Sequence, residues 1–236
     1  MSRKTHEAFK ATKTIKERES HELFINLSHG NKKLVSNEDI AFLIWNLPAV
    51  ITCPYRTAHC ETACYALKAE RNYPDALPSR MRHFEISRNP EFVDRMIFTI
   101  LTELSRPSNK NRKIVFRIHE SGDFYNMAYA KAWLEIMDYF KNNSKIVFVA
   151  YTKSVCFFDG LELPRNFKLL ASVWDDTKPA NLEIIARNHF KIYTAYKGDD
   201  LKRALASGFV KCRCEDCATC GKCWNRSKKS IVCEIH

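Results

Sequence analysis

The stretch that decides the fold is residues 114–151, IVFRIHESGDFYNMAYAKAWLEIMDYFKNNSKIVFVAY. Two apolar runs rich in β-branched residues, 114–118 and 146–151, read as strands. Between them, Met127, Ala130, Leu134 and Met137 recur at helical spacing. A strand, a helix and a second strand in this order form the crossover unit of a parallel sheet. This unit therefore predicts an α/β protein.

The same alternation continues on both sides of this unit. Near-continuous apolar strands separated by helices indicate a parallel sheet of at least five strands. The first choice is a partial or full β/α barrel of the TIM-like kind, and the second is an open doubly wound sheet. Besides the unit above, we expect strands at 41–45, 49–52, 167–173 and 191–196, and helices at 65–70, 79–104 with a break near Pro90, 181–189, and 199–206 ending before Gly208.

Composition and charge narrow the class of protein. The chain has 236 residues, of which 45% are hydrophobic and 28% charged, as in ordinary soluble globular proteins. It contains neither 18 consecutive apolar residues nor an apolar secretory segment near its start, so we expect no membrane span and a cytoplasmic location. The net charge of +11 favours contact with nucleic acid. Oligomeric state is not readable from the sequence.

We divide the chain into three parts. Residues 1–33 are an N-terminal arm, in which residues 1–22 are charged, poor in large apolar side chains and expected to be a mobile or loosely docked helix. Residues 34–210 are the barrel-like domain, which contains a cysteine loop at 53–64. Residues 211–236 are a Cys-rich segment with little to bury, of the kind that a metal holds in shape.

Three cysteines of the loop, Cys53, Cys60 and Cys64, follow the first predicted strands with the spacing C-x6-C-x3-C. Clustered cysteines in a reducing compartment favour metal binding over disulfides. Zinc with His59 as a fourth ligand is one interpretation, and buried thiols are another. A [4Fe–4S] cluster is the third, because three thiolates leave one iron open for a ligand.

Polar residues follow each predicted strand of the sheet. Because ligands of β/α folds bind at the carboxyl ends of the strands, we expect these residues to line one shared binding site, which we call the mouth. They are the cysteine loop, then residues 119–124 (HESGDF), 151–153 (YTK), 172–176 (SVWDD) and 196–197 (YK).

The Cys-rich segment carries a second signal. Cys217, Cys220 and Cys223 match the first three positions of a ferredoxin-type run, C-x2-C-x2-C. Cys212, Cys214 or Cys233 supplies the fourth thiolate in this interpretation. Such a site is an electron relay or a structural staple, and zinc is the rival metal because four thiolates also suit it.

These motifs resemble two known groups. The cysteine loop with its Cys64-Tyr65-Ala66 ending resembles a variant of the cluster loop of radical S-adenosylmethionine (SAM) enzymes, including phage proteins related to spore photoproduct lyase. Over residues 40–225 the chain more closely resembles the gene product 88 family of phage and bacterial proteins. The matching stretches, in order, are residues 46–49 (NLPA), 52–54 (TCP), 64–66 (CYA), 117–124 (RIHESGDF), 150–154 (AYTKS) and the closing C-x2-C-x2-C-W.

The resemblance implies a fold and a cofactor class, and leaves the substrate open. Cys53, Cys60 and Cys64 would ligate three irons, and the fourth iron would take the amino and carboxylate groups of SAM. An electron donor would then be a partner, and reductive cleavage of SAM would start hydrogen abstraction. The site would lie in the host cytoplasm if the protein is phage-encoded. The loop Glu120, Ser121, Gly122 and Asp123 would hold the SAM ammonium. Apart from the resemblance, the position of Lys153 at a strand end suits binding of a phosphate or carboxylate, and a solvated side chain is the alternative.

Three functions compete on this evidence. The first is an iron–sulfur enzyme of radical SAM-like architecture, acting on a nucleic acid or its precursor. The second is a zinc-bearing nucleic-acid-binding protein without redox chemistry. The third is a cluster protein that carries or senses electrons and does not bind SAM.

Overall fold

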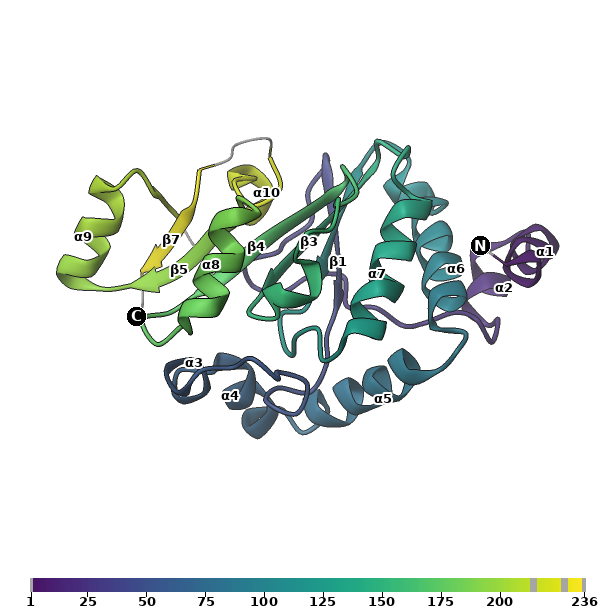
Figure 1. The fold of residues 1–236 in the computed structure, drawn as a ribbon. Coiled ribbons are helices and arrows are strands. Elements are labelled where there is room, and N and C mark those ends of the chain that lie inside the picture. Colours follow the sequence, from purple (N-terminus) through teal and green to yellow (C-terminus); the bar gives the residue numbers. More distant parts are fainter. Residues whose placement is uncertain (1, 213–215, 226–228, 235–236) are drawn as a thin grey trace.

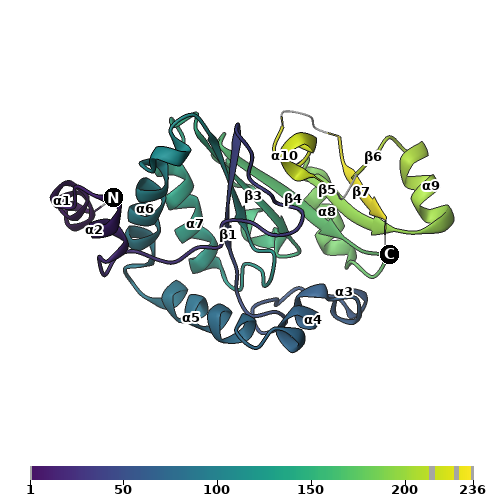
Figure 2. The same cartoon turned by 180° about the vertical axis from the view of Figure 1, so that it is seen from behind.

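The computed structural model describes residues 2–212, 216–225 and 229–234. Across these residues a single parallel sheet has seven strands in the order β1-β2-β3-β4-β5-β7-β6. The sheet is curled into a half-barrel, with β1 and β6 as separate edges (Figures 1 and 2). The strands are β1 (Ile40–Trp45), β2 (Lys113–Ile118), β3 (Ile146–Thr152), β4 (Phe167–Val173), β5 (Lys191–Tyr196), β6 (Val210–Lys211) and β7 (Ile231–Glu234).

Apart from α10, which lies over the inner face, the helices fall into three groups around the sheet. One group covers the outer face, a second lies along the end of the sheet at which the chain leaves β1, and a third forms the N-terminal arm (Figure 1). In the described ranges, no helix has the length and apolar character needed to cross a membrane. The α-helices are α1 (Arg3–Ala11), α2 (Ile15–Glu19), α3 (Ala58–Thr62), α4 (Tyr65–Asn72), α5 (Ala76–Arg88), α6 (Phe92–Leu104), α7 (Met127–Tyr139), α8 (Pro179–Arg187), α9 (Gly198–Ala206) and α10 (Cys217–Cys220), and two 3-10 helices are η1 (Pro107–Asn109) and η2 (Val155–Phe158).

The expected partial barrel is confirmed, and the two other architectures are wrong. Strands β1 to β5 are neighbours in chain order. Right-handed crossovers between sequential neighbours place their helices on one face, so the winding keeps one direction from β1 to β5 and turns back only at the far edge, where β7 lies between β5 and β6. A doubly wound sheet requires the reversal within the sheet, between two sets of strands whose helices cover opposite faces. A closed barrel requires β1 to pair with the opposite edge, whereas the sheet ends there at β6.

The strand expected at 49–52 is also wrong. These residues form a turn, in which the Ile51 amide donates to the Ala49 carbonyl over 2.6 Å and Val50 has φ = 65°. Pro48 cannot donate a ladder hydrogen bond, and the chain turns directly after it. The strand that leads to the cysteine loop is therefore β1. The strands β6 and β7 were not expected from the sequence.

The two faces of the sheet are buried in different ways. The outer face packs under α6 and α7, with Trp45, Phe116 and Trp133 fully buried. The inner face carries a smaller apolar cluster that includes Phe42 and Val115. We call this inner face the concave face. Figure 2 shows it from behind, with α10 lying over it and the large covering helices on the far side.

The N-terminal arm packs on helix α6. Thr5 is fully buried, and the Ser2 amide donates to the Asp94 carboxylate over 2.9 Å. The Arg18 guanidinium donates to the Ser105 hydroxyl over 2.6 Å. The arm therefore forms a docked pair of helices, α1 and α2, at the end of the molecule opposite α9 (Figure 1).

Candidate functional site

Two loops at the carboxyl ends of β1 and β2 are bonded directly to each other. The side-chain oxygen of Asn46, the first residue after β1, accepts from the amides of Glu120 at 2.8 Å and Ser121 at 3.1 Å. The Leu47 amide in turn donates to the Ser121 carbonyl over 2.9 Å. These bonds satisfy backbone groups that no strand partner can reach. Residues 46–49 therefore fix the position of the loop at 120–123.

Gly122 is required where these loops meet. Its φ is +82°, a conformation that side-chain-bearing residues rarely adopt. A Cβ atom at this position would lie 2.5 Å from the Thr52 hydroxyl oxygen and 2.6 Å from the Leu47 Cβ. Thr52 is itself fully buried and donates to the Pro48 carbonyl over 2.7 Å. The glycine lets the loop after β2 pack against the turn that precedes Cys53.

Asp123 joins the ends of β2 and β3. Its carboxylate accepts from the Thr152 hydroxyl at 2.5 Å, the Lys153 amide at 2.9 Å and the Phe124 amide at 2.7 Å. Burial raises the pKa of this carboxyl, while the three hydrogen bonds oppose the rise. The Ser154 hydroxyl adds a bond of 2.8 Å to the Phe124 carbonyl. Asp123 is thus a fixed group at the mouth, and the cap of α7 is Asn126.

Lys153 is a buried cation beside the cysteine loop. It is 8% exposed, and its ammonium donates to the Ser172 hydroxyl at 2.8 Å and the Ser172 carbonyl at 3.2 Å. Burial lowers the pKa of the ammonium, and the nearby Cys60 and Asp123 act in the opposite direction. Two hydrogen bonds leave one of its three N–H groups for a ligand.

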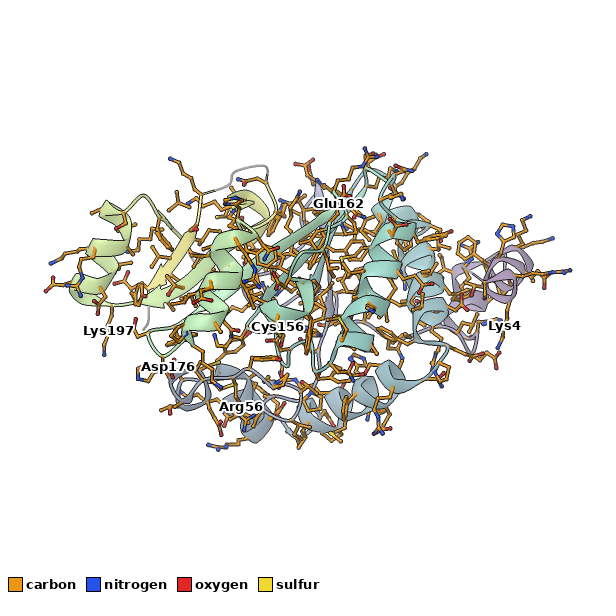
Figure 3. The ribbon with its side chains drawn as sticks, in the orientation of Figure 1. Lys4, Arg56, Cys156, Glu162, Asp176 and Lys197 are labelled. Carbon is orange, nitrogen blue, oxygen red and sulfur yellow. The ribbon has the colours of Figure 1, made fainter. Side chains whose placement is uncertain are left out.

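The cysteine loop is tied to the sheet from both sides. A buried carboxylate, Glu70, accepts from the Ala49 amide at 2.9 Å and from Arg80 at 2.8 Å. On the other side, the His59 amide donates to Asp176 over 2.9 Å. Figure 3 labels Asp176 at the boundary between the sheet and the layer of α3 and α4 that carries Arg56. These ties hold α3 over the carboxyl ends of the strands.

The three loop thiols are neighbours in this arrangement. Burial raises the pKa of the Cys53 thiol to about 12, and the charges of Asp123, Cys60 and Cys64 contribute to the rise. Burial also raises the pKa of Cys60, whereas the positive charge of Lys153 opposes it. All three cysteines are half-buried. The loop cysteines, Asp123 and Lys153 therefore occupy one neighbourhood.

The described residues do not contain a preformed metal site. In residues 2–212, 216–225 and 229–234, no three His, Cys, Asp or Glu side chains are arranged so that they could hold a metal ion. His59, expected as a zinc ligand in one interpretation, has its ring 4.0 Å from Asp176 and is 60% exposed. The loop thus offers neighbouring thiols without ligand geometry.

The other residues of the predicted SAM loop point in different directions. The Glu120 carboxylate accepts from the Asn31 side chain, on the segment before β1, and its carbonyl accepts from the Tyr65 hydroxyl. The Ser121 side chain is 1% exposed, and its hydroxyl has no hydrogen-bond partner among the described residues. A buried unpartnered hydroxyl is costly, so Ser121 is the residue of this loop that is open to a ligand.

The Cys-rich segment lies on the concave face. Asp216 caps α10 by accepting from the Ala218 amide at 2.9 Å. The Tyr151 hydroxyl donates to the Cys223 sulfur over 2.6 Å, and Trp224 packs edge-on against Phe42, with ring centroids 5.6 Å apart. Cys212 joins β7 through its amide, 2.7 Å from the Val232 carbonyl. Cys214 lies outside the described residues.

The tail thiols form a second group with different neighbours. Burial raises the pKa of the Cys217 thiol to about 11, and the thiols of Cys223 and Cys220 contribute to the rise. Burial also raises the pKa of Cys223, while its bond from Tyr151 and the charge of Arg117 oppose the rise. The groups that act on these thiols are therefore different from those at the mouth.

Sequence reasoning missed two functional features. Glu70 and Arg80 form the buried pair that supports the loop, and no local pattern distinguishes them from an exposed helical pair. Arg117 lies on the concave face, and for this residue a signal existed. It is the one charged residue in the run IVFRI, at the alternation that places it beside Val115.

Fold and site together define a class: an all-parallel α/β half-barrel with a three-cysteine loop at the carboxyl ends of its strands and further cysteines on its concave face. The chain belongs to the gene product 88 family, whose model matches residues 25–226. It is 26% identical to the gene 88 protein of Mycobacterium phage D29 over 202 residues, which cover 77% of this chain and 81% of the relative.

A second relative is similar to the same degree. The gene 88 protein of Mycobacterium phage L5 is 27% identical over 194 residues, which cover 74% of this chain and 78% of the relative. Neither name states an activity. No solved structure matches the chain significantly.

Proposed function

We propose that the chain is an iron–sulfur protein, and specifically a radical SAM-like enzyme. Cys53, Cys60 and Cys64 would hold a [4Fe–4S] cluster with one open iron, and the tail cysteines would hold a second cluster. The observation that supports the proposal is that the three loop thiols, Lys153 and Asp123 lie near the carboxyl ends of parallel strands, close enough for their charges to act on one another.

The donor set of the mouth fits this cofactor pair. Thiolates are the usual ligands of iron–sulfur clusters, and three of them leave one iron for SAM. Lys153 would bind the carboxylate of SAM through its remaining N–H group, and the unpartnered Ser121 hydroxyl and the Asp123 carboxylate would accept from its ammonium. The cluster, when bound and reduced, would supply the electron that cleaves SAM.

The remaining partners are also proposals. An electron donor is required by the redox step. The net charge of +11 favours a substrate that is nucleic acid or a nucleic-acid precursor. The named relatives are phage proteins, which supports the host cytoplasm as the location.

Anaerobic purification followed by metal analysis tests the cluster. We expect a brown protein with broad visible absorption and matching amounts of iron and acid-labile sulfide. A colourless protein that holds stoichiometric zinc and no sulfide would refute the iron–sulfur assignment at both sites.

Incubation of the reduced protein with SAM tests the enzyme assignment. We expect 5′-deoxyadenosine and methionine as products, and a spectral change on SAM addition. Iron-loaded protein that gives neither product nor spectral change would instead support an electron carrier or sensor.

Zinc at the tail site is the second candidate. The tail thiols lie on the sheet with a capped helix and a packed tryptophan, an arrangement that suits a structural four-thiolate zinc site as well. With a zinc tail and no loop cluster, the chain would be a nucleic-acid-binding protein without redox chemistry. Zinc that disappears in Cys220→Ala, in a protein without iron, would support this function.

A further inference from the structure

Arg117 occupies an unusual place for a charged side chain. It lies on β2, which is paired on one side with the edge strand β1 and on the other with β3, and whose residues Phe116 and Ile118 face the outer core. Because side chains alternate along a strand, Arg117 shares the concave face with Val115. Its side chain is half-buried. Arg117 is therefore a cation on the concave face of β2, beside apolar residues.

The guanidinium is held but not neutralised. Its Cζ atom lies 3.5 Å from the centroid of the Tyr151 ring, a cation–π contact, and its Nε donates to the His119 carbonyl over 3.0 Å. Among the described residues this is its only hydrogen bond, and no carboxylate comes within the 4.0 Å of an ion pair. The four N–H groups on its two terminal nitrogens remain available.

Other cations near this face are already engaged. The Lys153 ammonium donates twice to Ser172, and the Lys191 ammonium donates to the Lys222 carbonyl over 2.6 Å. The charge of Arg117 acts on the Tyr65 hydroxyl on one side and on the Cys217 and Cys223 thiols on the other. No hydrogen bond joins Arg117 to a sulfur atom in the described part of the chain. Arg117 thus lies between the two cysteine groups with open donors.

We infer that Arg117 binds an oxyanion of the substrate, a phosphate or carboxylate group, on the concave face between the two cysteine groups. The planar guanidinium presents paired N–H groups that match two oxygens of such an anion, and the Tyr151 ring holds the plane in place. This inference deepens the proposed function, because it names a chemical feature of the substrate of the same site.

Calorimetry on the anaerobically purified full-length protein tests the inference. The probes are a nucleoside, its 5′-monophosphate, inorganic phosphate and acetate. We expect the monophosphate to bind at least about tenfold more tightly than the nucleoside, as a charge-assisted bidentate contact requires. The inorganic phosphate and acetate arms show which oxyanion the residue prefers.

Variants test whether Arg117 causes the difference between monophosphate and nucleoside affinity. Arg117→Gln should reduce it to less than about twofold while nucleoside binding stays unchanged, and Arg117→Lys should keep part of it. Lys131→Gln removes a charge from the exposed surface of α7 on the other side of the sheet and should change nothing. A full difference in Arg117→Gln, or no oxyanion binding to the wild type at millimolar concentration, overturns the inference.

Two further measurements separate possible failures. Thermal unfolding shows whether Arg117→Gln is folded. If it is not folded, Arg117→Lys decides the matter, and a full difference between monophosphate and nucleoside affinity in that variant overturns the inference. Iron and sulfide are measured on the same samples. Arg117-dependent oxyanion binding in a protein without iron refutes the proposed function alone. Iron-loaded protein whose oxyanion binding is indifferent to Arg117→Gln refutes the inference alone.

Discussion

At the scale of single residues, the mouth depends on a few side chains that bond one loop to the next. Asn46 holds the loop after β2, Asp123 joins it to β3, and Gly122 allows it to approach Thr52. None of these residues needs a metal for its present contacts. Hydrogen bonds within the protein therefore hold the loops of the mouth in place, and this arrangement does not depend on the cysteine thiols.

Substitution of Gly122 tests this packing. Gly122→Ala should lower the free energy of unfolding by about 1–3 kcal/mol, because the new methyl group meets Thr52 and Leu47 in a left-handed conformation. Chemical denaturation measures the change. Gly160→Ala is the matched control, since its φ is +68° and no atom lies within 4 Å of the added Cβ. Equal losses in the two variants would show that the contact is unimportant.

Tyr151 provides a second residue-scale test. Tyr151→Phe removes the hydroxyl that donates to Cys223 and keeps the ring beneath Arg117. Hydrogen bonds to cluster sulfurs tune the reduction potential. If the tail holds the proposed cluster, we expect unchanged iron content and a more negative potential for that cluster, measured by redox titration. An unchanged potential would show that Cys223 is not a cluster ligand.

The residue types at the mouth could be predicted from the sequence, but their contacts could not. Strand ends in parallel sheets meet, so Asp123 and Lys153 were expected near the cysteines. The pairing of Glu70 with Arg80 depends on how α4 and α5 cross, which no local pattern encodes. The bond between the Glu120 side chain and Asn31, on a segment distant in sequence, could not be predicted either.

At the scale of elements, a buried carboxylate on α6 adds to the contacts that hold the N-terminal arm. Glu103 is fully buried on α6 and binds Arg106 at 2.7 and 2.8 Å, while His29 lies 3.2 Å away. Arg106 also bonds to Glu19 on α2 at 2.6 Å. Glu103 therefore connects the arm and the segment before β1 to the outer helices.

Glu103→Gln should weaken this connection. Loss of a charge-assisted pair with a buried partner should lower the free energy of unfolding by about 1.5–3 kcal/mol. Chemical denaturation measures the loss. Glu135→Gln removes an exposed carboxylate from α7 and should leave stability within about 0.5 kcal/mol. Similar values for the two variants would contradict the role of Glu103.

The same pair gives a pH dependence. Burial opposes ionisation of Glu103, but hydrogen bonds from His29 and Arg106 outweigh it and lower the pKa of Glu103. Its stabilisation is thus present above the usual glutamate range and is lost as pH falls through the lowered pKa. The bond to Glu103 raises the pKa of His29, so that contribution is complete in mild acid and is lost as pH rises through the raised pKa.

Thermal unfolding measured across a range of pH tests both effects. The stability of the wild type should be highest between the lowered pKa of Glu103 and the raised pKa of His29, and should fall on either side. Glu103→Gln should lessen both falls. A Glu103→Gln profile parallel to that of the wild type would show that other groups set the pH dependence.

Element-scale prediction worked where periodicity was strong and failed where tertiary contacts decide. The helices α5 to α9 and strands β2 to β5 follow their apolar patterns. Residues 49–52 are apolar enough for a strand, but the turn is imposed by Pro48 and by the Glu70 bond to Ala49. Strand β7 joins the sheet through pairing with β5, a contact across many residues of sequence.

At the scale of the whole molecule, the Cys-rich segment links the two edges of the half-barrel. Near one edge the Cys212 amide bonds to Val232 on β7. Towards the other edge the Cys217 amide donates to the Lys33 carbonyl over 3.1 Å, and Trp224 contacts Phe42 on β1. The segment therefore lies across the concave face from β7 to β1.

Trp224→Ala should loosen this link. Removal of a half-buried ring should cost about 2 kcal/mol and raise the amide exchange of α10 more than that of α7. Hydrogen exchange followed by mass spectrometry measures the difference. Unchanged protection of α10 would show that the tryptophan does not hold the segment to β1.

The measurement that tests the central claim most directly is the iron and sulfide content of anaerobically purified wild type, Cys60→Ala and Cys220→Ala, with Cys156→Ala as the control outside both cysteine groups. Two independent clusters predict that each of the first two variants loses about four irons and keeps the other four. Cys156→Ala should match the wild type. Loss of all iron in Cys60→Ala, or no iron in the wild type, would contradict an open-site cluster on the cysteine loop.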